Sequence, residues 1–265
     1  MGLLSGIDDI TGWTLLQKNG AAIQKAYAAD GSDKNDIAYF KSVAATLTTP
    51  EALLKNYRAL SFVATAYGLG SQVDQTAILH KLMTQDAKLP TSLAQQLSDN
   101  NYRVFAAALS IWAPPPFSSK ATIDAVIAGF QQHSFEASIG TDNTALQEAT
   151  YFTRNAGTVT KLSQIMADKP LLDVVRTSLG IPDSFSGLDY DQQVRILTPR
   201  VDLSQFKTAA GVAGIVSKFL AMDQLNQTLT NTGSSLLTLF NSGDGNSDGS
   251  SGGLTLSAKT LNLIL

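Results

Sequence analysis

Apolar side chains recur every three or four residues along most of the chain, which is the spacing of an α-helix. Ile10, Trp13, Leu16 and Ile23 follow this spacing and predict a first helix that ends near Gly31. No alternating segments joined by a tight turn occur before residue 240, so the pattern lacks the signature of β-hairpins. We therefore predict an all-α fold.

The remaining helices are expected at positions set by local capping signals. Thr49-Pro50-Glu51 combines an N-cap, a proline in the first turn and an acidic residue, so a helix should begin there and end near Gly68. Gly20 and Gly233 are possible breaks. Further helices are predicted around residues 37–43, within 73–97 as two short helices, and over 100–109, 121–139, 194–197 and 205–240.

Residues 35–69 recur without a gap as residues 147–181, so that Phe152 follows Phe40 by 112 positions and Gly180 follows Gly68 by the same number. Nine pairs are identical at this offset: Tyr39/Tyr151, Phe40/Phe152, Ala44/Ala156, Thr46/Thr158, Thr48/Thr160, Leu60/Leu172, Val63/Val175, Thr65/Thr177 and Gly68/Gly180. Farther along, Leu97 and Tyr102 align with Val201 and Phe206 at an offset of 104. A repeat of this kind specifies architecture and says little about chemistry.

The repeat predicts two tandem copies of a multi-helix unit packed as one pseudo-symmetric domain. We place the N-terminal helical repeat at residues 1–112 and the C-terminal repeat at 113–241, followed by a Gly/Ser linker at 242–253 and an apolar tail at 254–265. Residues 36–110 and 148–220 should superpose, with Phe40 and Phe152 at equivalent buried sites.

The apolar tail is the candidate interaction segment. It carries five leucines and an isoleucine in twelve residues: Leu254, Leu256, Leu261, Leu263, Ile264 and Leu265. The linker before it contains Asp244, Asn246 and Asp248, the first half of a calcium-binding loop. Thr255 stands where such a loop needs a bidentate glutamate, so we interpret this stretch as linker, with a cation site as the alternative.

The amino-acid composition of the chain limits the kinds of partner that it is expected to bind. Charged residues make up only 15% of the chain, and the net charge of −3 offers no electrostatic attraction to nucleic acid or anionic membrane. The absence of cysteine excludes disulfides and thiolate sites. Residues 1–6 lack the features of a cleavable signal peptide, and no apolar run reaches the ~20 residues that span a bilayer. We expect no membrane insertion.

The sequence offers little for catalysis. Its two histidines, His80 and His133, have no evident partner, and no nucleotide-binding, zinc or Ser-His-Asp motif occurs. Asp189 and Asp191 precede a short helix and are interpreted as its cap. We expect Glu136 and Arg154 to form a structural ion pair. No cofactor or metal is expected.

With the repeat laid out, the chain resembles the alphaproteobacterial family known as domain of unknown function 1217, over roughly residues 10–225. The resemblance rests on Gly12-Trp13, Asp36…Tyr39-Phe40, Leu53-Leu54…Arg58, Ala66-Tyr67-Gly68-Leu69, Asp99…Tyr102-Arg103, Phe135-Glu136, Tyr151-Phe152-x-Arg154, Asp168…Leu172 and Leu179-Gly180. Members of that family commonly contain the region in duplicate and often lie near flagellar genes. The resemblance therefore implies a non-catalytic, flagellum-associated protein, and it implies no catalytic residues.

Two main functional hypotheses follow. The first is a structural or assembly component of the bacterial flagellum that acts through contacts with flagellar subunits or with itself. The second is a cytoplasmic adaptor or chaperone for flagellar subunits. An enzyme, the third class, has no motif in its favour. Because residues 1–6 carry no cleavable signal, the sequence leaves both the flagellum and the cytoplasm open as the location.

Overall fold

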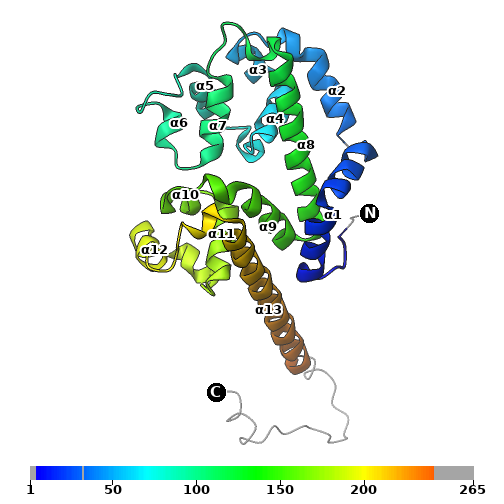
Figure 1. Ribbon diagram of the computed structural model, residues 1–265, viewed down its shortest axis with the longest axis vertical. Helices are drawn as coiled ribbons and strands as arrows, with labels where there is room; N and C mark the ends of the chain where they lie inside the picture. Colours follow the sequence, from blue (N-terminus) through cyan, green and yellow to red (C-terminus); the bar gives the residue numbers. More distant parts are fainter. Residues whose placement is uncertain (1–3, 32, 242–265) are drawn as a thin grey trace, which may run out of the picture. The chain divides into compact units, whose positions relative to one another are not determined.

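The structure is a computed structural model that describes residues 4–31 and 33–241. Within these ranges the chain forms α-helices and short 3-10 helices and contains no β-strand, which confirms the all-α prediction (Figure 1). The first eight α-helices are α1 (Asp9–Asp30), α2 (Lys34–Val43), α3 (Pro50–Lys55), α4 (Tyr57–Ala66), α5 (Thr76–Thr84), α6 (Leu93–Gln96), α7 (Asn100–Leu109) and α8 (Lys120–Asp142). The others are α9 (Thr144–Asn155), α10 (Leu162–Ala167), α11 (Lys169–Ser178), α12 (Tyr190–Leu197) and α13 (Ala209–Asn241).

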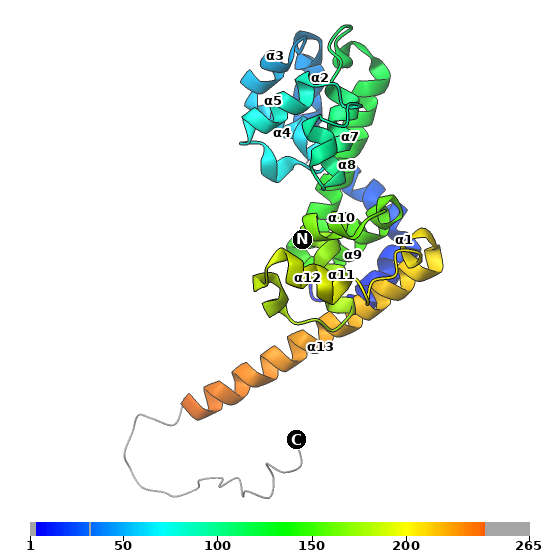
Figure 2. The ribbon, with the colours of Figure 1, turned by 90° about the vertical axis from the view of Figure 1, so that its left-hand side faces the viewer.

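Six 3-10 helices connect or extend these elements. They are η1 (Ala44–Thr46), η2 (Gly70–Gln72), η3 (Pro116–Ser118), η4 (Ala156–Thr158), η5 (Asp183–Gly187) and η6 (Gln205–Lys207). The chain divides into a large compact unit, residues 1–225, and a second unit from residue 226 onward. Helix α13 runs without a break from one into the other (Figure 2).

Capping explains where several helices begin and end. The Thr49 hydroxyl accepts the backbone N–H of Ala52 at 3.1 Å, and Pro50 occupies the first turn of α3 as predicted. The expected single helix from Pro50 is instead two, because Asn56 leaves helical geometry (φ −98°, ψ 84°) and caps α4 through its side chain. Gly20 and Gly233 do not interrupt α1 and α13.

Gly68 and Gly180 end α4 and α11 by the same device. Their φ angles of 74° and 66° lie in the left-handed region, which a residue with a Cβ enters only at a cost of about 1–2 kcal/mol. Each glycine N–H returns to the helix, to Thr65 O and Thr177 O respectively, at 2.9 Å. The predicted stops at both positions are confirmed.

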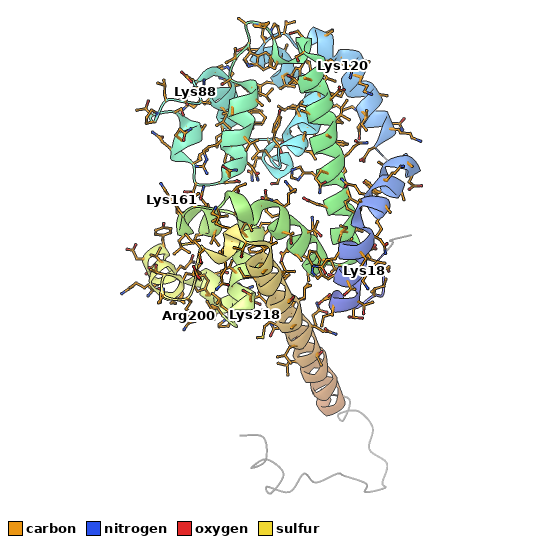
Figure 3. All side chains as sticks on the ribbon, in the orientation of Figure 1. Lys18, Lys88, Lys120, Lys161, Arg200 and Lys218 are labelled. Atoms are coloured by element: carbon orange, nitrogen blue, oxygen red, sulfur yellow. The ribbon has the colours of Figure 1, made fainter. Side chains whose placement is uncertain are left out.

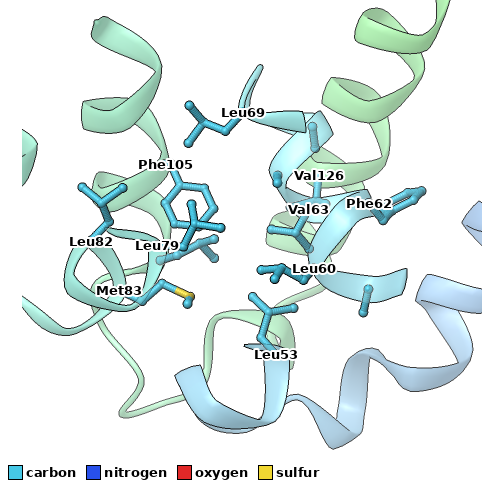
Figure 4. Packing of buried hydrophobic residues seen from close by; sticks show 14 of the residues in the cluster. Leu53, Leu60, Phe62, Val63, Leu69, Leu79, Leu82, Met83, Phe105 and Val126 are labelled. Carbon is cyan, nitrogen blue, oxygen red and sulfur yellow. The ribbon is translucent and has the colours of Figure 1, made fainter. Parts of the chain in front are cut away.

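Two main hydrophobic clusters form the core of the large unit. The first gathers residues of α2 to α5, α7, η3 and the N-terminal half of α8, among them the buried Leu60, Leu79 and Phe105 (Figure 4). In it Phe62 stacks between the rings of Phe40 and Phe130, with centroid distances of 4.7 and 4.0 Å. Such aromatic pairs add about 0.5–1.5 kcal/mol each to the stabilisation from burial.

The second main cluster gathers residues of α1, the C-terminal half of α8, α9 to α11, η6 and α13. A smaller third cluster lies around Phe185 and Leu197. Phe152 is fully buried in the second cluster, as Phe40 is in the first. Leu16 of α1 packs into the second cluster rather than the first, and α8 contributes Phe130 to one cluster and Ile139 to the other.

Candidate functional site

The predicted interaction tail and the half calcium loop lie outside the described residues. This applies to Leu254, Leu256, Leu261, Leu263, Ile264 and Leu265, and to Asp244, Asn246 and Asp248. Within residues 4–31 and 33–241 no three His, Asp or Glu side chains gather closely enough to hold a metal ion. In the same ranges no helix is both long and apolar enough to cross a membrane.

The two histidines lie apart and have different surroundings. His80 on α5 contacts Glu51 at 3.1 Å, and both side chains are about half exposed. His133 on α8 is largely buried, with its Nδ1 3.6 Å from a carboxylate oxygen of Glu136. Burial, and then the positive charge of Arg154, lower the pKa of His133. Neither histidine forms a catalytic pair with a nucleophilic side chain in the part of the chain described.

Glu136 and Arg154 form the expected ion pair. The Arg154 Nε and one terminal nitrogen donate to the two carboxylate oxygens at 2.7 and 2.8 Å, and the Glu136 side chain is only 3% exposed. Gln132 also donates to Glu136 at 2.8 Å, and Gln24 of α1 donates to Gln132 at 2.7 Å. The chain of contacts joins α1, α8 and α9, so its role is to hold three helices together.

A second polar network surrounds Tyr151. Its hydroxyl donates to Asp168 at 2.7 Å and accepts from the amide of Asn101 at 3.2 Å, which links α9 and α11 to α7. Burial raises the pKa of Asp168 to about 6 and, together with the nearby Asp168 charge, raises the pKa of Tyr151. The cavity beside these groups measures about 10 Å³, so it admits nothing larger than water. We interpret this network as structural.

Asp189 caps α12 as predicted, because its carboxylate accepts the N–H of Gln192 at 2.8 Å. Asp191 lies in the first turn of the same helix. The hydrogen bond of Tyr151 to the cap residue Asp168 was not predicted. A signal was present, because Tyr39 and Asn56 have the same separation and make the equivalent bond at 3.0 Å.

Two surface features of the described residues are suited to binding. The first is on α13, where Leu225 is 49% exposed and Leu229, one turn later on the same helix face, is 62% exposed. The second is an open cavity of about 110 Å³ between α11, the segment around residues 200–206 and α13. Arg200 and Lys218, both exposed, stand at this cavity (Figure 3).

The chain is similar to one protein family and to a solved structure. The model of the family described as "Protein of unknown function (DUF1217)" matches residues 66–212, and no curated protein matches the chain. A crystal structure of a protein from Agrobacterium tumefaciens has a similar fold, with a TM-score of 0.70. It is 20% identical in sequence, and the match covers 80% of this chain and 91% of that one. The protein belongs to the DUF1217 family.

Proposed function

We propose that the protein is a non-catalytic structural or assembly component that acts through protein contacts, with partners in the bacterial flagellum. The observation that carries the proposal is the pair of exposed leucines on α13, Leu225 and Leu229. Large apolar side chains on adjacent turns of one helix face are typical of a surface that another protein covers. The flagellar association rests on gene position: genes of the family that the chain resembles often lie near flagellar genes.

The spacing of these two leucines continues in the sequence after residue 229. Positions 225, 229, 232, 236 and 239 follow alternating steps of four and three residues, and four of the five are leucine. This is the spacing of one helix packing along another. We propose that the face, together with the apolar tail at 254–265, contacts flagellar subunits or a second copy of the chain.

We further propose that the two main clusters belong to two copies of one helical unit. At the offset of 112 residues η1 corresponds to η4, α3 to α10 and α4 to α11, with identical lengths in each pair. Phe117 of η3 meets Phe40 edge to face at 5.5 Å, and Phe206 of η6 meets Phe152 in the same way at 5.4 Å.

The proposed pairing of helices implies a different alignment at one place. Tyr102 lies within helix α7, whereas Phe206 lies in a 3-10 turn, so the two are not equivalent. In this pairing the counterpart of Phe206 is Phe117, 89 residues earlier, and the same offset brings the start of α8 onto the start of α13. Between these points the first copy has α5, α6 and α7 where the second has α12. Helix α8 then belongs to the first copy, so the proposed boundary moves from residue 112 to the end of α8.

The function is tested with the double variant Leu225→Glu/Leu229→Glu in the full chain. If the partner is a second copy, the charges should abolish self-association in analytical ultracentrifugation. If the partner is a flagellar subunit, they should abolish co-sedimentation with purified flagellar structures. In both cases the circular dichroism spectrum should be unchanged. Leu89→Glu is the matched control, because Leu89 is 51% exposed but lies in the loop between α5 and α6.

Cell fractionation separates the two flagellar roles. A structural component should be recovered with purified flagella from motile cells. An adaptor or chaperone would instead appear only in the cytoplasmic fraction, bound to one flagellar subunit, and that result would overturn the structural proposal. Association with neither flagella nor any flagellar subunit would end the flagellar assignment altogether.

A further inference from the structure

Half of the residues that line the open cavity beside α11 and α13 are apolar, and the other half are polar or charged. Val175, Leu179, Phe206 and Ile215 contribute side chains to it. An apolar cavity of about 150 Å³ in another protein accommodates benzene, so 110 Å³ with an open side suits a ring or a branched alkyl group. The apolar half of the lining suits a compact apolar group.

Two positive charges stand at the same cavity. Arg200 and Lys218 are both exposed, and neither has a carboxylate within 4 Å among the residues that the structure describes. Asp202 also lines the cavity, but its carboxylate accepts the N–H and the hydroxyl of Ser204 at 2.9 and 2.7 Å. The side chains at the cavity thus carry a net charge of about +1 at neutral pH, which favours an anionic ligand.

The first copy of the proposed repeat differs from the second at the position of the cavity. There Gly129 of α8 lies against the carbonyl of Ala66, and a Cβ at Gly129 would approach that oxygen to 2.4 Å. The corresponding residues in the second copy are Lys218 and Ser178, both of which line the cavity. A lysine cannot make the close contact that glycine makes, so α13 cannot approach α11 at this position as α8 approaches α4. This comparison rests on the proposed repeat, whereas the cavity and its charges do not.

We propose that this cavity binds a carboxylate carried on a compact apolar group. The apolar part lies among Val175, Leu179 and Ile215, and the carboxylate meets Arg200 and Lys218. Guanidinium pairs with carboxylate through two parallel hydrogen bonds, which gives direction to the contact. The ligand is either a small free acid or an acidic residue next to an apolar one in a partner protein.

Titration of the isotope-labelled full chain, followed by nuclear magnetic resonance, tests the proposal. Phenylacetate is expected to shift the backbone amide signals of Ser178, Leu179 and Ile215 in a saturable manner. Phenylacetamide, which has the same shape without the charge, should bind at least threefold more weakly. Equal binding of the acid and the amide, or shifts that do not saturate, would overturn the proposal.

Variants assign the binding to this cavity. Arg200→Gln and Lys218→Gln should each weaken phenylacetate binding at least twofold, and Ser178→Leu, which fills the space, should abolish it. Lys88→Gln is the control, because Lys88 is exposed and does not line the cavity (Figure 3). If the three cavity variants behave like Lys88→Gln, the cavity is not the binding site.

Two dipeptides distinguish the sources of the carboxylate. N-acetyl-Asp-Phe-amide carries the proposed chemistry in a peptide, and N-acetyl-Asn-Phe-amide is its neutral counterpart. Tighter binding of the Asp peptide than of phenylacetate supports a protein partner. Binding of phenylacetate without binding of the Asp peptide supports a small free acid.

Discussion

Replacing Arg154 with methionine should destabilise the large unit strongly, because it leaves the buried Glu136 without its counter-charge. Arg154 makes two hydrogen bonds to this carboxylate, at 2.7 and 2.8 Å. Removing one partner of a buried ion pair costs about 3–5 kcal/mol. Arg154 itself is 34% exposed, and Gln132 still donates to Glu136 in the variant, so we place the loss at about 3 kcal/mol. For a unit of this size that loss lowers Tm by roughly 6–12 °C.

The matched control is Arg58→Met. Arg58 also pairs with a carboxylate, that of Asp36 at 2.8 Å. Its guanidinium lies over the ring of Tyr39, as that of Arg154 lies over the ring of Tyr151. Both members of that pair are about half exposed, so its loss should cost less than about 1 kcal/mol. Urea unfolding followed by circular dichroism measures both variants. Losses within 1 kcal/mol of each other would refute the argument from burial.

The other predictions concern the glycine stops and the response to pH. Gly180→Ala should lower the free energy of unfolding by about 1–2 kcal/mol, because alanine is strained in the left-handed backbone. Gly68→Ala should lower it by about 1 kcal/mol more, because the new Cβ would also lie 3.0 Å from the Asn101 amide. Equal losses of the two variants in urea unfolding would contradict this. Burial raises the pKa of Asp168 to about 6 and that of Glu148 to about 7, above their unfolded values, so the folded state binds more protons and stability should rise as pH falls from 8 to 5. In the double variant Asp168→Asn/Glu148→Gln, the urea midpoint should vary less with pH between 8 and 5. An unchanged pH dependence would show that these two carboxyl groups are not its cause.

Local signals in the sequence predicted much of the fold. Helical periodicity and the Thr49-Pro50 cap located helices, and Gly68 and Gly180 located stops, because capping and left-handed turns depend on a few neighbouring residues. The Glu136–Arg154 pair was predicted on similar grounds, since a charge among apolar residues needs a partner.

Long-range packing could not be predicted in the same way. The apolar face of α1 is visible in the sequence, but nothing local indicates that Leu16 packs into the second cluster. The cavity lies between α11 and α13, and no local signal in the sequence indicates how these two helices pack. The Tyr151–Asp168 bond was within reach of sequence analysis, because a tyrosine and a cap residue recur at the same separation in both segments.

Helix α8 serves both main clusters, with Phe130 in the first and Ile139 in the second. Loss of α8 as a whole would uncover both clusters, because one hydrogen-bonded backbone carries residues of both. Opening that unfolds the whole of α8 should therefore expose both cores together, and amide exchange that depends on this opening should be similarly slow in the two cores. The large unit should behave as one cooperative folding unit, even though its apolar residues are divided between separate cores.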